Sequence, residues 1–308
     1  MSDDGPLMRC RIAIPATCAN LGPGFDVLAL ALELQNEVVV EQTGEEGITL
    51  DVGPGAPPEL RDASTNLVCT AYAGASRAMG HRGDGVAITC VNRIPLRRGL
   101  GSSAAAALGG VLAAVCIHRP DWDERRILDQ CIALEGHADN AAAALLGGLA
   151  IVAPGVAPVT MAVSDEVLCV VFIPDVELST REARGVVPLQ YSREDVVFNL
   201  GRVALLVRAI AERDWDAVGD AMDDRFHQPQ RTPLMPWLPD LLGAARASGA
   251  VGACLSGAGP SVLALTWRDP ERVQAGLMAA AKRHGLRGRT VVSRVRNYGS
   301  RVDSGMVA

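Results

Sequence analysis

A glycine-rich segment at residues 95–105 constrains this chain more than any other feature. It has the sequence P-L-R-R-G-L-G-S-S-A-A, follows a segment rich in β-branched residues at 86–91, and leads into an alanine-rich stretch from about Ser102. Gly99 and Gly101 allow the backbone to approach a ligand, the serines add hydroxyl groups, and the unpaired N–H groups at a helix start favour an anion. The segment therefore predicts a strand, a loop that binds phosphate, and then a buried helix.

Two alternatives remain open for this loop. A tight turn between strand and helix, with Ser102 as N-cap, explains the glycines equally well. Residues 99–104 also match the dinucleotide fingerprint G-x-G-x-x-A, but the next ~20 residues predict two helices where that fingerprint requires a strand ending in an acid. Lys282 is the only lysine and lies far from any glycine-rich loop, so a Walker-type phosphate loop would lack its lysine.

Two further loops are rich in glycine. Residues 15–26, P-A-T-C-A-N-L-G-P-G-F-D, follow the first predicted strand and place Asn20 and Asp26 beside apolar sequence. Unpaired polar groups are costly there, and a ligand would satisfy them. Residues 256–261, S-G-A-G-P-S, lie between the apolar runs 251–255 and 262–265, and a plain hairpin loop explains this third segment at least as well as a binding loop.

Charge and composition exclude several classes of protein. The net charge is -6 and no basic run alternates with aromatic residues, so the chain is not expected to bind nucleic acid or an anionic membrane. The longest apolar run, residues 104–117, is shorter than the roughly 20 residues that a membrane-spanning helix needs. Asp3 and Asp4 occur in an N-terminal segment with no signal-peptide core, which predicts a cytoplasmic location.

The cysteines and histidines give no metal or disulfide pattern. No C-x-x-C pair occurs and most cysteines lie in apolar segments, so all are predicted to be reduced thiols of the core, at positions 10, 18, 69, 90, 116, 131, 169 and 254. The five histidines lack the spacing of zinc ligands, and a zinc site is not expected.

The rest of the chain predicts an α+β fold. The segments with strand character are residues 9–14, 37–42, 48–52, 86–91, 149–152, 167–173 and 290–295, with a strand–turn–strand at 252–266. Helices are predicted at 66–79, capped by Ser64 or Thr65, from Ser102, from Asp121, at 193–212, at 239–247 and from Pro270. Polar and proline residues at 153–165 predict a domain boundary between residues 150 and 165.

In this order and spacing, the three loops resemble the three motifs of the GHMP kinases, and the resemblance spans nearly the whole chain. The middle loop is similar to the nucleotide loop P-x-x-x-G-L-G-S-S-A-A at all eleven positions. The first loop resembles the signature of the homoserine kinase branch, with Cys18 in place of the usual serine. Residues 135–148, 179–184 and 228–231 are similar to the further elements E-G…H-x-D-N…G-G, S-T-x-E-A-R and P-x-R of that branch.

The resemblance implies a two-domain GHMP kinase fold, with the site between the domains. Residues 1–160 would form the N-terminal, ATP-binding domain and residues 161–308 a C-terminal domain of the α/β sandwich type. The implied cofactors are ATP and Mg²⁺, with Ser103 and Glu135 as oxygen ligands of the metal. The nucleotide would be bound by the middle loop, that is by Pro95, Leu96, Arg97, Arg98, Gly99, Leu100, Gly101, Ser102, Ser103, Ala104 and Ala105.

The implied substrate is L-homoserine, which carries an ammonium, a carboxylate and a hydroxyl group. Such a molecule calls for an acid and for guanidinium groups. The resemblance assigns Asp26 to the amine and both Arg184 and Arg231 to the carboxylate. Asn20, His137, Asn140 and Thr180 would complete the substrate site.

The resemblance also implies the residues nearest the reaction: Asp139, Asn140 and Arg184. Asp139 aligns with an acid proposed as general base in some GHMP kinases; a hydrogen-bond acceptor that orients a neighbour is the alternative, and homoserine kinases are thought to rely on positioning. Relatives often form dimers, which makes a homodimer an expectation. Another GHMP kinase, acting on threonine or mevalonate, and a catalytically silent relative that binds a nucleotide or an amino acid are the competing functions.

Overall fold

The computed structural model describes residues 8–82, 85–118 and 121–306, which fold around two β-sheets. The first sheet has seven strands, with β11-β1-β2-β4-β3 in spatial order and β5 and β6 continuing from β2. Among the described strands, β3 and β4 are paired in parallel and the other pairs are antiparallel. The strands are β1 Met8–Asn20, β2 Gly24–Gln42, β3 Ile48–Asp51, β4 Val86–Val91, β5 Leu149–Ala153, β6 Val156–Met161 and β11 Arg301–Met306.

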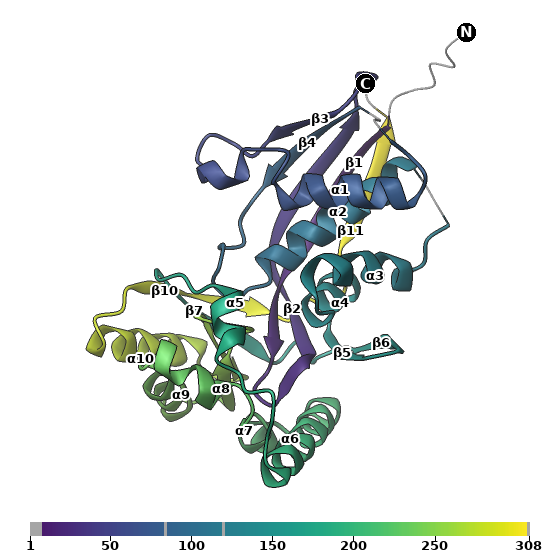
Figure 1. The fold of residues 1–308 in the computed structure, drawn as a ribbon. Helices are drawn as coiled ribbons and strands as arrows, with labels where there is room; N and C mark the ends of the chain where they lie inside the picture. Colours follow the sequence, from purple (N-terminus) through teal and green to yellow (C-terminus); the bar gives the residue numbers. More distant parts are fainter. Residues whose placement is uncertain (1–7, 83–84, 119–120, 307–308) are drawn as a thin grey trace.

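The second sheet is antiparallel and has the order β10-β7-β9-β8. Its strands are β7 Leu168–Pro174, β8 Gly252–Leu255, β9 Val262–Thr266 and β10 Gly288–Arg294. Helices α9 Leu238–Ala247 and α10 Pro270–Arg283 cover this sheet, while α6 Arg193–Glu212 and α7 Trp215–Ala221 pack together beside it (Figure 1). β7 and β9 are almost fully buried, which agrees with their unbroken apolar sequences.

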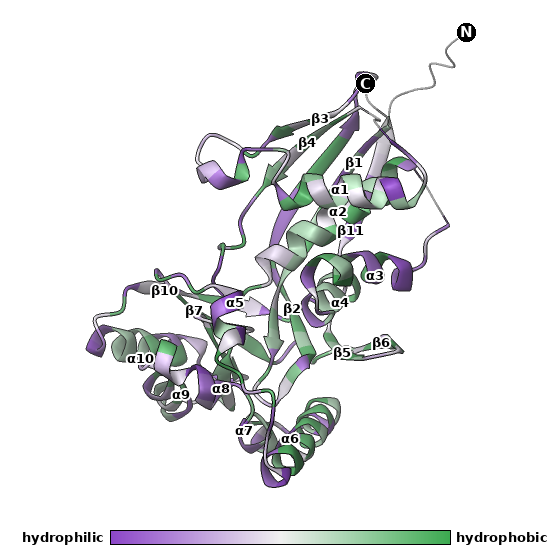
Figure 2. Ribbon diagram, in the orientation of Figure 1, coloured by the Kyte–Doolittle hydropathy of each residue, from purple (hydrophilic) through white to green (hydrophobic). Residues whose placement is uncertain are grey.

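Four helices accompany the first sheet: α1 Leu67–Ala78, α2 Ser102–His118, α3 Glu124–Glu135 and α4 Asp139–Leu146. α2 is apolar on nearly every side, as Figure 2 shows, because it is packed between the sheet and α1. Two glycines allow this packing: a Cβ on Gly109 would lie 2.9 Å from Val38, and one on Gly110 would lie 2.2 Å from the Val68 carbonyl oxygen. The buried helix predicted from the apolar run is confirmed.

The remaining helical turns are η1 Pro58–Leu60, between β3 and α1, and three turns between β7 and α9: α5 Thr180–Gly185, α8 Gln228–Arg231 and η2 Thr232–Leu234. α5 and α8 lie close to the first hairpin, and both carry predicted site residues (Figure 1). The α+β character expected from the sequence is present in both halves of the chain, each of which has a sheet and helices.

Several local predictions were wrong. Residues 15–26 form mainly strand rather than loop, because β1 continues to Asn20 and β2 begins at Gly24. The N-cap of α1 is Asn66, whose side chain accepts a hydrogen bond from the Val68 N–H. α3 is capped by Asp123, two residues after the predicted start. β6 occupies part of the segment predicted as a domain boundary, and β11 returns the chain to the first sheet beside β1.

The prediction of eight unpaired thiols was wrong for two of them. Cys10 of β1 and Cys116 of α2 form a disulfide whose Cα atoms are 6.5 Å apart and whose partners are separated by 106 residues. Neither cysteine belongs to a local motif, so only the packing of α2 on β1 brings the pair together. The other six cysteines are free and buried.

The described residues contain neither a membrane-spanning helix nor a cluster of metal-binding side chains. No helix within residues 8–306, outside the two short gaps, has the length and hydropathy of a membrane span. Over the same residues, no three side chains of histidine, cysteine, aspartate or glutamate form a group that could hold a metal ion.

Candidate active site

The three glycine-rich loops meet at one place between the sheets. The Ser256 hydroxyl donates a hydrogen bond of 2.6 Å to the Gly99 carbonyl oxygen, joining the third loop to the middle one. The Gly257 N–H donates to the Ala19 carbonyl oxygen, joining the third loop to the first hairpin. The N–H of Thr17 donates to the Leu100 carbonyl oxygen, which closes the set. The loops therefore form one hydrogen-bonded unit.

The middle loop is shaped by glycines that contact the other two loops. Arg97, Gly99 and Gly101 have φ values of 52°, 73° and 70°, and α2 begins directly afterwards at Ser102. A Cβ on Gly101 would lie 2.0 Å from Thr17 Oγ1, and one on Gly99 would lie 2.2 Å from the Ser256 carbonyl oxygen. These glycines are required by packing, and the backbone that they shape presents the N-terminus of a seventeen-residue helix, a favourable place for an anion.

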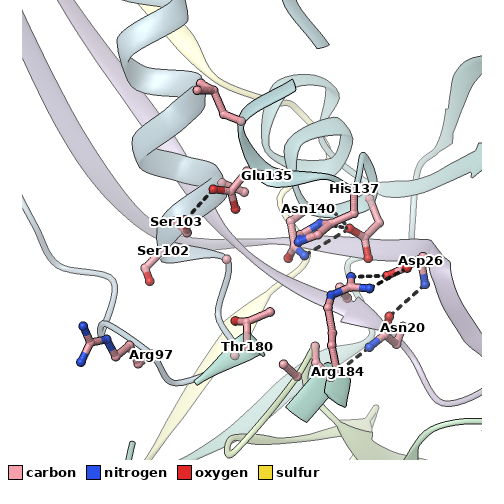
Figure 3. A pocket seen from close by; sticks show the side chains of 18 of the residues that line it. Asn20, Asp26, Arg97, Ser102, Ser103, Glu135, His137, Asn140, Thr180 and Arg184 are labelled. Atoms are coloured by element: carbon pink, nitrogen blue, oxygen red, sulfur yellow. Dashed lines mark hydrogen bonds and ion pairs between the residues drawn. The ribbon is translucent and has the colours of Figure 1, made fainter. Parts of the chain in front are cut away.

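A cavity of about 290 Å³ lies where the loops meet, and Figure 3 shows the side chains around it. It is lined by Ala19, Asn20, Asp26, Arg97, Gly99, Gly101, Ser102, Ser103, Ala104, Leu134, Glu135, His137, Asp139, Asn140, Thr180, Arg184, Arg231, Gly257 and Ala258. Every residue predicted for the substrate, the metal or the reaction is among them. Of the predicted nucleotide loop, Pro95, Leu96 and Arg98 line a neighbouring cavity instead, while Leu100 and Ala105 are buried in the core.

Asp26 and Arg184 form a bidentate ion pair at the wall of this cavity. Arg184 Nη1 and Nη2 donate to Asp26 Oδ2 and Oδ1 at 2.9 and 2.6 Å. The hydrogen bond from Arg184 to Asp26 raises the pKa of Arg184, and burial opposes that shift. Asp26 has a φ of 56°, and its N–H donates to Asn20 Oδ1, so the hairpin turn sets the position of the carboxylate.

Arg231 lies deeper, with an exposed fraction of only 1%. Its Nε donates to the Ala183 carbonyl oxygen at 3.0 Å, and its Nη1 donates to the Gly257 carbonyl oxygen at 3.0 Å. Burial, followed by repulsion from Arg184, lowers the pKa of Arg231 to about 10. The guanidinium carbons of Arg184 and Arg231 lie 5.3 and 5.5 Å from the centre of the Phe25 ring, so both cations contact the same aromatic side chain.

A second polar group is built on the start of α4. Asp139 is 1% exposed, and its Oδ1 accepts hydrogen bonds from His137 Nδ1 at 3.0 Å and from the Asn140 N–H at 2.8 Å. The hydrogen bond to Asp139 raises the pKa of His137. Thr17 Oγ1 donates to Asn140 Oδ1 at 2.7 Å, so Asn140 is held from both sides. Thr17 was missed by the sequence reasoning although it belongs to the first glycine-rich segment.

Ser103 and Glu135 face each other across the entrance to α2. The Ser103 hydroxyl donates to Glu135 Oε1 at 2.6 Å (Figure 3). Glu135 is the last residue of α3, and Gly136 ends the helix with a φ of 79°. A carboxylate at the C-terminal end of a helix opposes the helix dipole, and a bound cation would offset that cost. The donor set, two hard oxygens beside the N-terminus of α2, is of the kind that magnesium prefers.

A neighbouring cavity of about 590 Å³ adjoins the middle loop and was not anticipated. Its lining combines apolar side chains with a few polar ones: Val52, Gly53, Gly55, Ala56, Pro57, Leu60, Cys90, Val91, Asn92, Arg93, Ile94, Pro95, Leu96, Arg98, Glu177 and Arg289. The predicted strand that ends near residue 91 leads into it, so its position follows from the fold rather than from a local motif.

Comparison with known families and proteins agrees with this geometry. The family described as GHMP kinases N terminal domain matches residues 66–148, and GHMP kinases C terminal matches residues 206–283. The homoserine kinase of Desulfitobacterium hafniense is 38% identical over 298 residues, covering 95% of this chain and 99% of that protein. The homoserine kinase of Streptomyces coelicolor is 40% identical over 295 residues, covering 92% and 94%.

Solved structures give the same picture. The crystal structure of homoserine kinase from Cytophaga hutchinsonii superposes with a TM-score of 0.87 at 27% identity, covering 98% of this chain and 99% of that one. A galactokinase of Lactococcus lactis, complexed with galactose, superposes with a TM-score of 0.72 at 12% identity over 95% of each chain. At that identity the second match shows a shared fold only.

Proposed function

This chain belongs to the homoserine kinase family of the GHMP kinases, and we propose that it transfers the γ-phosphoryl group of ATP to the hydroxyl of L-homoserine, giving O-phospho-L-homoserine for threonine biosynthesis. One observation supports the choice of substrate most directly. A carboxylate and two guanidinium groups, those of Asp26, Arg184 and Arg231, line the same cavity as the N-terminus of α2, which is a favourable place for a phosphate. An amino acid and a phosphoryl donor therefore fit side by side.

The ammonium and carboxylate groups of the substrate would replace the existing ion pair between Asp26 and Arg184 with two new ion pairs. The carboxylate of homoserine would take the place of Asp26 on Arg184, and its ammonium would take the place of Arg184 on Asp26. Arg231 would add a second cation for the carboxylate. The Asn20 side chain would hold Asp26 in place, because Asn20 Oδ1 accepts a hydrogen bond from the Asp26 N–H. Because the protein charges are paired beforehand, the site binds a zwitterion without leaving either charge uncompensated.

The phosphoryl donor would lie along the middle loop. The N-terminus of α2, with Ser102 and Ser103, offers N–H and hydroxyl donors to the phosphates. The cavity beside Leu96, which also contains Val52 and Leu60, offers apolar surface to the base. Ser103 and Glu135 would hold Mg²⁺, which when bound supplies positive charge between phosphate oxygens.

Asp139 and Asn140 would prepare the acceptor hydroxyl. Asp139 Oδ1 already accepts from His137 and Asn140, so it orients both neighbours. Among the described residues, no group donates to Asp139 Oδ2, and this second oxygen would accept the hydroxyl proton as the oxygen–phosphorus bond forms. A loose transition state requires little proton removal beforehand, so positioning would contribute more than base strength.

ADP release measured with a panel of hydroxylated substrates tests the proposal. We expect the highest kcat/KM with L-homoserine, compared with L-threonine, L-serine, mevalonate and galactose. Preference for mevalonate or galactose would overturn the amino-acid site while leaving kinase activity intact. Tight nucleotide binding without turnover of any acceptor would indicate a silent relative instead. The cytoplasmic location stays a prediction.

We infer a homodimer that pairs α6 with its counterpart across a two-fold axis. Val197, Leu200 and Leu205 are 62%, 66% and 48% exposed and lie on one side of this long helix, whose hydrophobic residues Figure 2 displays. Gly201 and Ala204, also exposed, lie between them and allow close approach of a second helix. Antiparallel pairing centred on Gly201 would place Glu194 opposite an arginine, Arg208 of the second copy.

Light scattering coupled to size-exclusion chromatography tests this interface. We expect a dimer for the unmodified chain and a monomer for Leu200→Asp. Val159→Asp, at a similarly exposed position on β6, is the matched control and should remain a dimer. A monomeric unmodified chain, or loss of the dimer in both variants, would contradict the α6 interface.

A further inference from the structure

His227 is a fully buried histidine that none of the roles above uses. Its exposed fraction is 0%, and it immediately precedes α8, the short helix that carries Arg231. Its Nε2 lies 2.8 Å from the Gly22 carbonyl oxygen in the turn of the first hairpin. Its Nδ1 lies 2.9 Å from Arg231 Nη1. The imidazole therefore connects the β1–β2 turn to one of the two proposed substrate arginines.

The partners of His227 determine which nitrogen carries the proton. A carbonyl oxygen can only accept, so Nε2 must donate to Gly22. A guanidinium can only donate, so Nδ1 must accept from Arg231 with its lone pair. This arrangement requires the neutral imidazole. Burial is the main cause that lowers the pKa of His227 well below its ordinary value. The positive charge of Arg231 lowers it further, while the negative charges of Asp224 and Asp26 oppose the shift.

Asp224 holds the segment that carries His227. Its side chain is fully buried, and its oxygens accept hydrogen bonds from the N–H groups of Phe226, His227 and Gln228 at 2.8, 3.0 and 2.7 Å. Asn199 of α6 donates to the same carboxylate at 2.7 Å. Three consecutive N–H groups are thereby fixed, which leaves the imidazole little freedom to turn away from Arg231.

The contacts of Arg231 leave one nitrogen for a ligand. Nε is used by Ala183, and Nη1 is shared between His227 and Gly257. Among the described residues, none accepts a hydrogen bond from Nη2, and Arg231 lines the cavity. Because a guanidinium is planar, fixing Nε and Nη1 also fixes the direction of Nη2.

We propose that His227 is a positioning residue, whose Nδ1 orients the Arg231 guanidinium so that Nη2 points at the carboxylate of the amino-acid substrate. This inference rests on the proposed function of the site and assigns a task to a residue that does not touch the substrate. In this proposal the two ring nitrogens have different tasks. The acceptor Nδ1 orients Arg231 for substrate binding, whereas the donor Nε2 stabilises the hairpin turn through Gly22.

Two amide variants separate these two tasks. Asparagine places its Oδ1 as many bonds from Cα as Nδ1, so His227→Asn keeps the acceptor for Arg231 and loses the donor to Gly22. Glutamine places its Nε2 as many bonds from Cα as the histidine Nε2, so His227→Gln keeps the donor and loses the acceptor. Both variants are neutral and polar, and both are compared with the unmodified chain by homoserine kinetics, KM for ATP and thermal unfolding.

We expect His227→Gln to raise KM for homoserine about tenfold, with kcat and KM for ATP within about twofold, and His227→Asn to stay within about threefold of the unmodified chain. Adding His227→Gln to Arg231→Ala should raise KM no further. The inference would be overturned if His227→Asn raised KM for homoserine more than His227→Gln, if both variants raised it equally, or if only the melting temperature changed. An unmodified chain that does not phosphorylate homoserine would instead refute the proposed function.

Discussion

Replacing Arg184 with alanine separates a structural ion pair from a substrate clamp. Both side chains of the Asp26–Arg184 pair are about one-third exposed, at 33% and 35%, so the pair itself should contribute no more than about 1 kcal/mol to stability. For a chain of this size, that free energy corresponds to a decrease in melting temperature of roughly 2–4 °C.

The expected effect on activity is much larger. A guanidinium that grips a carboxylate with two charge-assisted hydrogen bonds contributes about 3 kcal/mol, which corresponds to roughly a hundredfold decrease in kcat/KM for homoserine. Affinity for ATP should change less than about threefold, because the phosphates are assigned to the middle loop. Arg181→Ala, at an exposed arginine of the same helix, is the control and should alter neither quantity.

Arg231→Ala provides the contrast. That substitution leaves the buried acceptors of Ala183 and His227 without the donor they have in the native protein, whereas the Gly257 carbonyl oxygen keeps its hydrogen bond from Asn20. It should therefore lower stability by about 3 kcal/mol as well as lowering kcat/KM. If both arginines hold one carboxylate, the double variant should lose less activity than the product of the single losses. A normal kcat/KM in Arg184→Ala, with a small change in melting temperature, would refute the clamp and leave a surface ion pair.

Three further outcomes can be measured. Glu135→Gln should fold normally and require about tenfold more Mg²⁺ for half-maximal turnover, since an amide is a poorer ligand for a hard cation; an unchanged magnesium titration would remove Glu135 from the metal site. A reducing agent should lower the melting temperature by roughly 10 °C, because the Cys10–Cys116 disulfide joins positions 106 residues apart, and a Cys10→Ser/Cys116→Ser variant should show no response to reductant. Gly101→Ala should reduce nucleotide affinity more than about tenfold, since its Cβ would lie 2.0 Å from Thr17 Oγ1, whereas Gly243→Ala, with open space around it, should be silent; equal affinities would contradict the tight loop.

The sequence was sufficient for features that a local pattern encodes. α6 begins and ends at the predicted residues, Arg193 and Glu212, and the buried α2 follows from its alanine-rich run. The site was predictable to the extent that whole motifs carried it. Residues 15–26 could be proposed as a binding segment because they place Asn20 and Asp26 beside apolar sequence, and residues 95–105 because glycines and serines there precede a predicted helix.

Contacts between distant parts of the chain could not be predicted in the same way. No local signal indicates that Arg184 would pair with Asp26, 158 residues away, or that Thr17 would hold Asn140. The roles of Gly99 and Gly101 show the same limit. Their sequence context indicates freedom of the backbone, but the close approach to Ser256 and Thr17 depends on how three separate loops pack.

The pairing of β11 with β1 has a consequence for how the chain folds. β1 is bonded on one side to β2, its neighbour in sequence, and on the other side to β11, which follows every other described element. The register that joins Met8 to Met306 closes a loop containing nearly all of the chain, and such non-local pairing slows folding. Until residues 301–306 are made and docked, β1 exposes an unpaired edge to other molecules, which is a template for aggregation. We therefore expect the first sheet to be completed last, with the pairing of β11 to β1 as the step that protects the nascent protein from self-association.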